Sequence, residues 1–164
     1  MPIIKIYPSK RPVRGILQYI TRGDTVPEEL IRTNGCDILD AEQEFSDIAR
    51  YYNKPTGAGN RHMIVSYNTT YEKISPEEVR DMVKDLCQRT KIDCYQWYLA
   101  VHTDRPDHMH AHVVINNVSY RGDRKQHVKA GKSFQSTGKL RHELMEKGNV
   151  ICKERGYEHS LVNT

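Results

Sequence analysis

Four histidines lie close together in one stretch of the chain, residues 95–116, which reads YQWYLAVHTDRPDHMHAHVVIN. They are His102, His108, His110 and His112. Three imidazoles that leave one coordination position vacant are typical of a catalytic divalent metal site rather than a closed structural one. Asp104 and Asp107 lie between the histidines, and carboxylates commonly orient the imidazoles that bind a metal. The stretch therefore predicts a metal centre rather than isolated surface histidines.

The elements around these histidines must hold the imidazoles on a common surface. Residues 95–101 and 111–115 are rich in aromatic and aliphatic side chains, and a polar segment with a proline separates them. This pattern predicts two antiparallel strands joined by a short loop. Because side chains alternate between the faces of a strand, His110 and His112 share one face. His102 closes the preceding strand and can meet that pair across the ladder, which predicts a three-imidazole cluster on rigid sheet.

The size and composition of the chain limit its class. With 164 residues, 37% hydrophobic and 28% charged, it is expected to form one well-hydrated domain, residues 1–164, with a real core. No apolar run approaches the ~20 residues that cross a bilayer, and the first residues have no signal-peptide pattern, so we expect a cytoplasmic location. The four cysteines are dispersed without a CxxC pair, which favours neither a disulfide framework nor a zinc knuckle.

Basic residues form two clusters, one on each side of the histidine stretch in the sequence. The net charge is only +4. The first cluster lies near the N-terminus and contains Lys5, Lys10, Arg11, Arg14 and Arg22. The second follows the histidines and contains Arg121, Arg124, Lys125, Lys129 and Lys132. Either cluster alone is typical of a solvated surface, whereas two clusters that flank a metal site favour a polyanionic partner such as nucleic acid.

The rest of the chain mixes helix and strand patterns. The patterns predict strands at 2–7 and 61–68. They predict helices from Pro12 towards Gly23, from Asp40 to Tyr52, after the capping residue Ser75 and at about 137–155. Between these elements they predict a single turn at 28–32, a tight turn at 33–36, a flexible loop at 54–60 and a mobile basic loop at 120–132. Because the strongest strand pair is a hairpin, the predicted fold class is α+β, with a central antiparallel sheet and flanking helices.

A metal held by three neutral imidazoles is a Lewis acid that can polarise a phosphoryl oxygen. It would support hydrolysis by a bound water or attack by a side chain. Ten tyrosines make any single one a weak candidate nucleophile. Tyr19 differs from the others in having basic residues on both sides, and a phenol with a pKa near ~10 needs such neighbours or a metal to become reactive.

The histidine stretch resembles the third motif of relaxases, the mobilisation nucleases of conjugative plasmids and transposons, in their MobA/VirD2-like branch. That motif is a His, an Asp two residues later, a His-x-His and an Asn after aliphatic residues. The corresponding positions are His102, Asp104, His110, His112 and Asn116.

Two earlier segments complete the resemblance. GILQYITRGD resembles the first motif and places the nucleophile at Tyr19, and RHMIVSYN resembles the second motif and indicates Ser66. NGCDILDAEQEF is similar to the spacer between them. The motifs occur in the family's order and cover nearly the whole chain.

The resemblance implies the fold of the HUH endonucleases and the nicking of one DNA strand at an origin of transfer. Tyr19 would attack the scissile phosphate and leave a 5′-phosphotyrosyl bond, with Asp104 orienting a ligand histidine and Ser66 contacting the phosphate or nucleophile region. The implied cofactor is a divalent metal ion, Mg²⁺ or Mn²⁺, with Zn²⁺ or Ni²⁺ as in-vitro substitutes. Its ligands would be His102, His110 and His112. The DNA backbone would be held by Lys10, Arg11, Arg14, Arg22, Arg121, Arg124, Lys125, Lys129 and Lys132.

The chain departs from the family pattern in two respects. His108 is a fourth imidazole, which we expect to lie outside the ligand set, as an outer group or a DNA contact. No helicase, primase or secretion region follows, so the domain is expected to be either the N-terminal part of a longer protein or a minimal mobilisation protein. The implied partners are single-stranded DNA with an adjacent hairpin, relaxosome accessory proteins and a secretion coupling protein in the bacterial cytoplasm, and a monomer is expected.

Two alternatives remain open from the sequence. A replication initiator or single-tyrosine transposase of the same superfamily would use a tyrosine after the histidine motif, and the candidate is Tyr157. A non-catalytic nucleic-acid-binding domain with structural zinc would need a fourth ligand, which His108 or Asp104 could supply.

Overall fold

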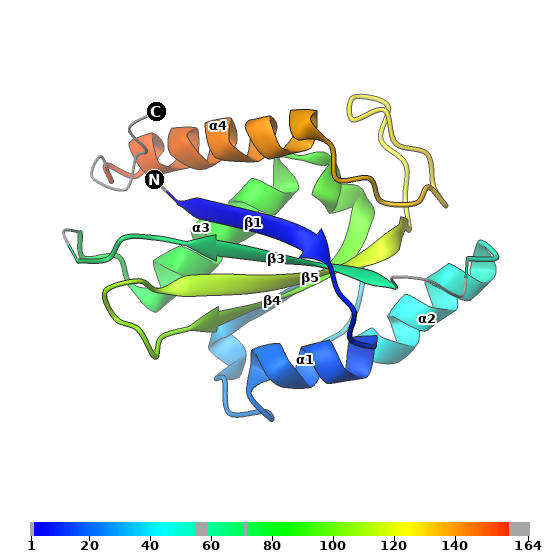
Figure 1. The fold of residues 1–164 in the computed structure, drawn as a ribbon, viewed down its shortest axis with the longest axis horizontal. Helices are drawn as coiled ribbons and strands as arrows, with labels where there is room; N and C mark the ends of the chain where they lie inside the picture. The colour runs from blue at the N-terminus through cyan, green and yellow to red at the C-terminus, as the bar shows by residue number, and fades with distance from the viewer. Residues whose placement is uncertain (1, 55–58, 71, 158–164) are drawn as a thin grey trace.

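The computed structural model describes residues 2–54, 59–70 and 72–157, and an antiparallel sheet runs through its centre (Figure 1). The sheet has five strands in the order β1-β3-β5-β4-β2, and every neighbouring pair is antiparallel. The strands are β1 (Ile3–Pro8), β2 (Ile31–Asn34), β3 (Asn60–Ser66), β4 (Tyr95–His102) and β5 (His110–Ser119). The helices are α1 (Val13–Thr21), α2 (Ala41–Tyr51), α3 (Pro76–Gln88) and α4 (Gly138–Glu154), with short 3-10 turns η1 (Glu28–Leu30) and η2 (Lys91–Cys94). The predicted α+β class is confirmed.

The helices cover the two faces of the sheet in pairs (Figure 1). α3 and α4 pack over the larger core, to which the central strands contribute Leu99 and Val113, both fully buried. α1 and α2 pack on the other face, where Tyr98 and Val114 form a smaller cluster with Phe45 of α2. Alternation along each central strand therefore sends one set of side chains to each layer.

The layer of α1 and α2 covers only part of its face. α1 packs on β4 and β5, and α2 packs on β5. On β1 the side chains of Lys5 and Tyr7 remain exposed, and Ile64 and Ser66 of β3 are half-buried. An uncovered strip of sheet therefore lies beside α1, and the side chains of this strip are at least partly open to solvent.

Helix boundaries follow the capping residues that the sequence predicts, with one exception. The Ser75 hydroxyl accepts a hydrogen bond from the backbone N–H of Glu78 at 3.1 Å, and Thr137 caps α4 in the same way. α1 ends where Arg22 adopts the left-handed conformation, with φ of 51°. Asp40 precedes α2 as predicted, but its side chain makes no capping hydrogen bond, so that detail of the prediction is wrong.

The predicted turns between 28 and 36 are partly wrong, because residues 31–34 form the edge strand β2. Ile31 pairs with Ala100 of β4 and is buried in the cluster beneath α1. Pairing and burial override the local turn pattern, and the chain reverses only at Gly35, whose φ is +66°. A side chain at Gly35 would also collide with the Tyr120 ring, since its Cβ would lie 2.7 Å from Tyr120 Cζ.

Two predicted loops have different outcomes. Residues 120–132 contain no regular strand, but backbone hydrogen bonds between Asp123 and Val128 close a tight bridge within them. The predicted flexible loop at 54–60 lies largely outside the described residues. None of the helices in the described ranges combines the length and apolar character needed to cross a bilayer.

Truncation of a core leucine tests the two-layer packing. Leu86 of α3 is fully buried, whereas the side chain of Leu39 is 92% exposed. Leu86→Ala should lower the free energy of unfolding by about 2–5 kcal/mol, because burial is lost and a cavity remains. Leu39→Ala should change it by no more than about 0.5 kcal/mol. Urea denaturation followed by circular dichroism measures both, and equal losses would contradict the described packing.

Candidate metal centre and active site

Three histidines converge on the face of the sheet that carries α1. In the register of β4 and β5, His102 lies opposite His110, and His112 lies opposite Ala100. The ring centroids of His102 and His112 are 4.2 Å apart, and the ligand nitrogens of all three residues lie within 4.8 Å of one another. The predicted convergence of the imidazoles is therefore present in the structure.

Each of these rings has one nitrogen held by a neighbouring histidine or a backbone carbonyl, and the second nitrogen of His102 also lies 3.2 Å from Arg22 Nη2. His102 Nε2 donates to the Ile20 carbonyl at 2.7 Å. His112 Nδ1 lies 2.7 Å from His62 Nε2, and His110 Nδ1 lies 3.3 Å from the His108 carbonyl. This arrangement leaves His110 Nε2 and His112 Nε2 to face a cation, and a cation would replace the Arg22 contact at His102 Nδ1. An imidazole fixed through its second nitrogen is the usual form of a metal ligand, so the residues present fit a divalent ion.

Burial favours the neutral, ligating form of two of these imidazoles. Desolvation, reinforced by the neighbouring His102 and His62, lowers the pKa of His112 to about 2. Burial is also the main reason that the pKa of His102 lies below its ordinary value, and Arg22 adds to the effect. Both rings are therefore neutral near pH 7, and no proton has to leave them when a metal binds.

A fourth histidine of the site, His62 on β3, was missed by the sequence analysis. Its Nδ1 lies 2.8 Å from the Tyr7 hydroxyl, so a chain of hydrogen bonds runs from Tyr7 through His62 to His112. When His112 ligates through Nε2, its Nδ1–H donates to His62 Nε2, and His62 Nδ1–H donates to Tyr7. The alternation in RHMIVSYN places His62 on the same face as Ser66, which could have indicated that His62 belongs to the site. The conclusion also requires the pairing of β3 with β5, which brings His62 beside His112.

Tyr19 lies in the last turn of α1 and faces the histidines. Its ring centroid is 5.8 Å from that of His112 and 6.4 Å from that of His62. The adjacent Ile20 is fully buried against the sheet, which directs Tyr19 to the rim of the site, where 48% of it stays exposed. The Arg11 guanidinium carbon lies 4.7 Å from the centroid of the Tyr19 ring, so the phenol lies in a positive field.

Asp104 has a different partner from the one predicted. Its carboxylate accepts from Arg22 Nη2 at 3.2 Å, and the same guanidinium nitrogen lies 3.2 Å from His102 Nδ1. The Ile20 carbonyl, rather than a carboxylate, orients His102 through the second ring nitrogen. Asp104 therefore positions Arg22, and its hydrogen-bonded connection to His102 runs through that guanidinium.

The other two predicted residues of this region lie at its margin. Ser66 is half-buried and stands opposite His110 in the pairing of β3 with β5, on the same face as the cluster. His108 lies in the loop before β5, where its Nε2 is 3.8 Å from the Asp107 carboxylate and its side chain is exposed. In the described ranges the set of converging ligands contains neither His108 nor Asp104, so it resembles an open site and not a closed zinc site.

Residues 19–150 match the family described as the nuclease domain of the MobA/VirD2-like relaxases. The chain belongs to this relaxase family. Among curated relatives, two proteins named rlx from Staphylococcus aureus are 28% and 26% identical over 121 residues each, which is 74% of this chain. The alignments cover 35% and 34% of those relatives, so the chain spans about a third of their length.

A solved structure has the same fold as this relaxase domain. It is described as the molecular basis of vancomycin resistance transfer in Staphylococcus aureus, and the two chains superpose with a TM-score of 0.64. The match covers 96% of this chain and 95% of the other, with 11% sequence identity.

The alternative nucleophile lies away from the histidines of the relaxase domain. Tyr157 follows α4 and packs against the core cluster under α3 and α4, which is the opposite layer of the sheet. Tyr19 and the imidazoles share the α1 layer. The geometry therefore favours the motif order of relaxases over that of initiators and transposases.

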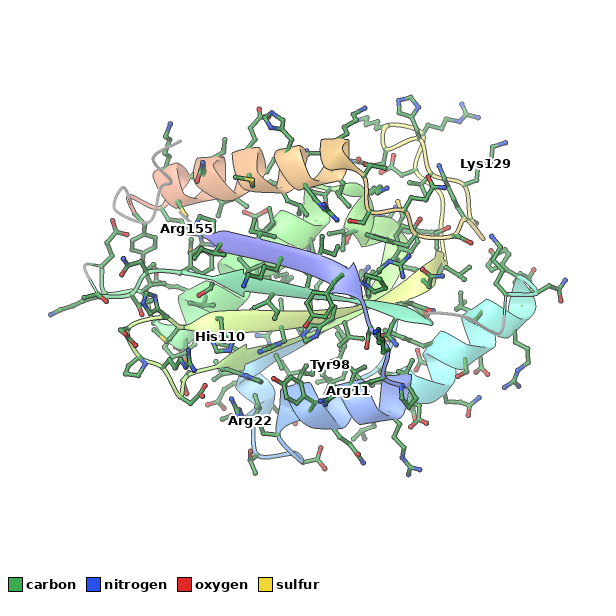
Figure 2. The ribbon with its side chains drawn as sticks, viewed as in Figure 1. Arg11, Arg22, Tyr98, His110, Lys129 and Arg155 are labelled. Carbon is green, nitrogen blue, oxygen red and sulfur yellow. The ribbon has the colours of Figure 1, made fainter. Side chains whose placement is uncertain are left out.

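The two basic clusters of the relaxase domain differ in their distance from the histidines. Lys10 and Arg11 precede α1 and border the site, and Arg22 contacts His102. The second cluster follows Ser119 at the far end of β5, a strand whose ten residues span about 30 Å. Figure 2 shows Lys129 near one end of the domain and His110 near the other. Within the second cluster, Arg121 also pairs with Asp93 at 2.6 Å.

Removal of one of the three converging imidazoles should greatly weaken the affinity for a metal ion. We expect His112→Ala to weaken Mn²⁺ affinity by at least about 100-fold, because one of three donors is lost. His108→Ala, in which an exposed imidazole of the loop before β5 is removed, should bind Mn²⁺ as the unmodified chain does. Isothermal titration with Mn²⁺ measures both variants, and a larger loss in His108→Ala would show that the ligand set is wrong.

Removal of His62 should weaken the same affinity by a smaller factor. His62→Phe retains an aromatic ring but no longer accepts the His112 N–H, so we expect about a 10- to 100-fold loss in Mn²⁺ affinity. Tyr7→Phe leaves the His62–His112 contact in place and should cost less. An unchanged affinity in His62→Phe would mean that His112 is oriented by packing alone.

Proposed function

We propose that this domain nicks one DNA strand at an origin of transfer by tyrosine transesterification, as part of conjugative mobilisation of a plasmid or transposon. The observation that carries the proposal is the position of the Tyr19 phenol, whose ring centroid is 5.8 Å from that of His112 and beside three imidazoles whose ligand nitrogens lie within 4.8 Å of one another. Membership of the relaxase nuclease family supports the same chemistry.

In the proposed reaction Tyr19 Oη forms a bond to the scissile phosphorus. The bond from phosphorus to the 3′ oxygen breaks, the phenolic proton is released, and the leaving oxygen takes up a proton to become a free 3′-OH. One phosphodiester replaces another, so the step is close to neutral in energy and can reverse to rejoin the strand. His102, His110 and His112 would hold a divalent cation, Mg²⁺ or Mn²⁺, and the bound ion would supply a Lewis acid that offsets the charge developing on the phosphoryl oxygens.

Residues around the phenol prepare it for attack. Arg11 lies over the Tyr19 ring, so its positive charge stands beside the phenol that would attack. Arg22, held by Asp104, lies beside His102 and can pair with a non-bridging oxygen of the phosphate. Ser66, at the margin of the cluster, is positioned to contact the same phosphate or its neighbour.

The proposed DNA contacts follow the two basic clusters. Lys10, Arg11 and Arg22 border the site, and together with Arg14 they would hold the backbone near the scissile phosphate. The distant cluster, Arg121, Arg124, Lys125, Lys129 and Lys132, would hold a remote part of the DNA such as the hairpin beside the nick. Contacts of this kind fix position without specifying sequence. Accessory relaxosome proteins and a secretion coupling protein in the bacterial cytoplasm belong to the same proposal.

Substitution of the nucleophile tests the proposal directly. With Mn²⁺ and labelled single-stranded oligonucleotides of varied sequence, the unmodified chain should give a covalent protein–DNA band on a denaturing gel. Tyr19→Phe should lose that band completely, because no other oxygen replaces the phenol. Tyr157→Phe should retain it, since that ring packs in the opposite layer. A band that survives Tyr19→Phe and disappears in Tyr157→Phe would overturn the assignment.

A further inference from the structure

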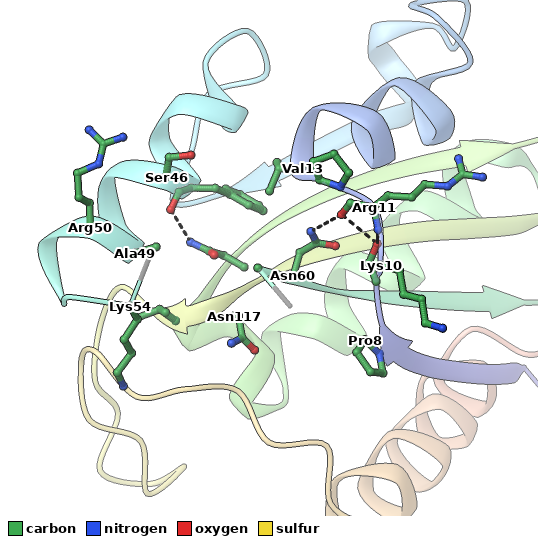
Figure 3. A pocket seen from close by; sticks show the side chains of 16 residues that line it. Pro8, Lys10, Arg11, Val13, Ser46, Ala49, Arg50, Lys54, Asn60 and Asn117 are labelled. Carbon is green, nitrogen blue, oxygen red and sulfur yellow. Dashed lines mark hydrogen bonds between the residues drawn. The ribbon is translucent and has the colours of Figure 1, made fainter. Parts of the chain in front are cut away.

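A second cleft lies beside the proposed nicking site, and no step of the proposed reaction uses it. Its volume is about 750 Å³, and it is bounded by the linker between β1 and α1, by α2 and by the ends of β3 and β5 (Figure 3). A volume of this size is typical of a site for a small molecule or a single nucleotide.

The charge of the cleft favours an anion. Four basic residues line it, Lys10, Arg11, Arg50 and Lys54, and no acidic residue does among those that the structure describes. α2 carries three acidic residues, Glu42, Glu44 and Asp47, yet none of them lines the cleft. In Figure 3 the side chains of Lys10 and Arg50 extend from its rim. A phosphodiester passing over the mouth would therefore meet positive charge on both sides.

The wall and the floor of the cleft suit a base. Phe45, Val13 and Ala49 form an apolar wall. On the floor, Asn60 is held in one orientation because its Nδ2 donates to the Arg11 carbonyl at 3.3 Å. Its Oδ1 is buried and has no hydrogen-bond partner within the described residues, and the same holds for Asn117 Oδ1. A base offers an apolar face to the wall and N–H donors on its edge to such oxygens.

The cleft shares a wall with the proposed site of attack. A smaller cleft of about 370 Å³, lined by Tyr7, Tyr19 and His62, lies on the other side of the same linker. Both clefts share residues 8–11, and Arg11 contacts the Tyr19 ring while its backbone carbonyl holds Asn60. We infer that the larger cleft binds one unpaired nucleotide of the DNA strand, adjacent to the phosphate that Tyr19 attacks, an assignment that rests on the proposed function.

Photocrosslinking locates the nucleotide without knowledge of the target sequence. The Tyr19→Phe chain, which should not cleave, is mixed with a short oligothymidylate that carries 5-iodouracil, irradiated and digested for mass spectrometry. We expect crosslinks in the peptides that contain Phe45 or residues 8–13. Crosslinks confined to other surfaces, such as residues 120–132, would overturn the inference.

A variant that fills the cleft provides the second measurement. Ala49→Trp should lower affinity for oligothymidylate by about tenfold in fluorescence anisotropy, because the base is displaced from the wall. Gln43→Trp adds the same ring at an exposed position of α2 that does not line the cleft and should leave affinity unchanged. If Ala49→Trp does not fold, Arg50→Glu at the rim and Arg141→Glu on α4 form an equivalent pair. Equal losses in both members of the folded pair would contradict the inference.

The outcomes separate this inference from the proposed function. A covalent Tyr19 adduct together with crosslinks elsewhere would remove only the nucleotide cleft. Crosslinks in the cleft without any adduct would remove only the nicking proposal. Thymidine monophosphate, tested as a competitor, should not displace the oligonucleotide at equal nucleotide concentration, and full displacement would indicate a site for free mononucleotides and overturn the assignment to the DNA strand.

Discussion

The site depends on the register of three central strands. A shift of one residue between β5 and either neighbour would move His110 and His112 to the opposite face of the sheet. The register is fixed by the other face, where Ala111, Val113 and Ile115 alternate with the histidines and are fully buried under α3 and α4. Burial of apolar surface, which is not itself part of any chemistry, therefore determines which side chains can meet a cation.

Three residues at the end of α1 contact the same site. Tyr19 presents the phenol, the Ile20 carbonyl accepts from His102, and Arg22 lies beside the other ring nitrogen of that histidine. Carbonyls in the last turn of a helix have no partner within the helix, so Ile20 is free to orient a ligand. Because one helix end holds both the proposed nucleophile and the carbonyl that orients His102, their separation is fixed by the packing of α1 on β4 and β5.

The parts of the site that could be predicted are those encoded within one hairpin. His102, His110 and His112 lie within eleven residues, so alternation and a loop are enough to bring them together. His62 is fifty residues from His112, and its role appears only when β3 is paired with β5. β2 was missed for a similar reason, since its pairing with β4 joins residues far apart in the chain. Asp104 lies at the motif position expected for a histidine partner, yet it pairs with Arg22, a residue whose approach depends on the placement of α1.

Diffraction from Mn²⁺-soaked crystals at the manganese absorption edge would test the central claim most directly, because anomalous scattering identifies the ion and its ligands without relying on catalysis. The account predicts one strong peak, bonded to His102 Nδ1, His110 Nε2 and His112 Nε2, with the Tyr19 hydroxyl facing it. A peak held instead by the carboxylates of the loop before β5, or an ion bound through only one of these imidazoles, would contradict it.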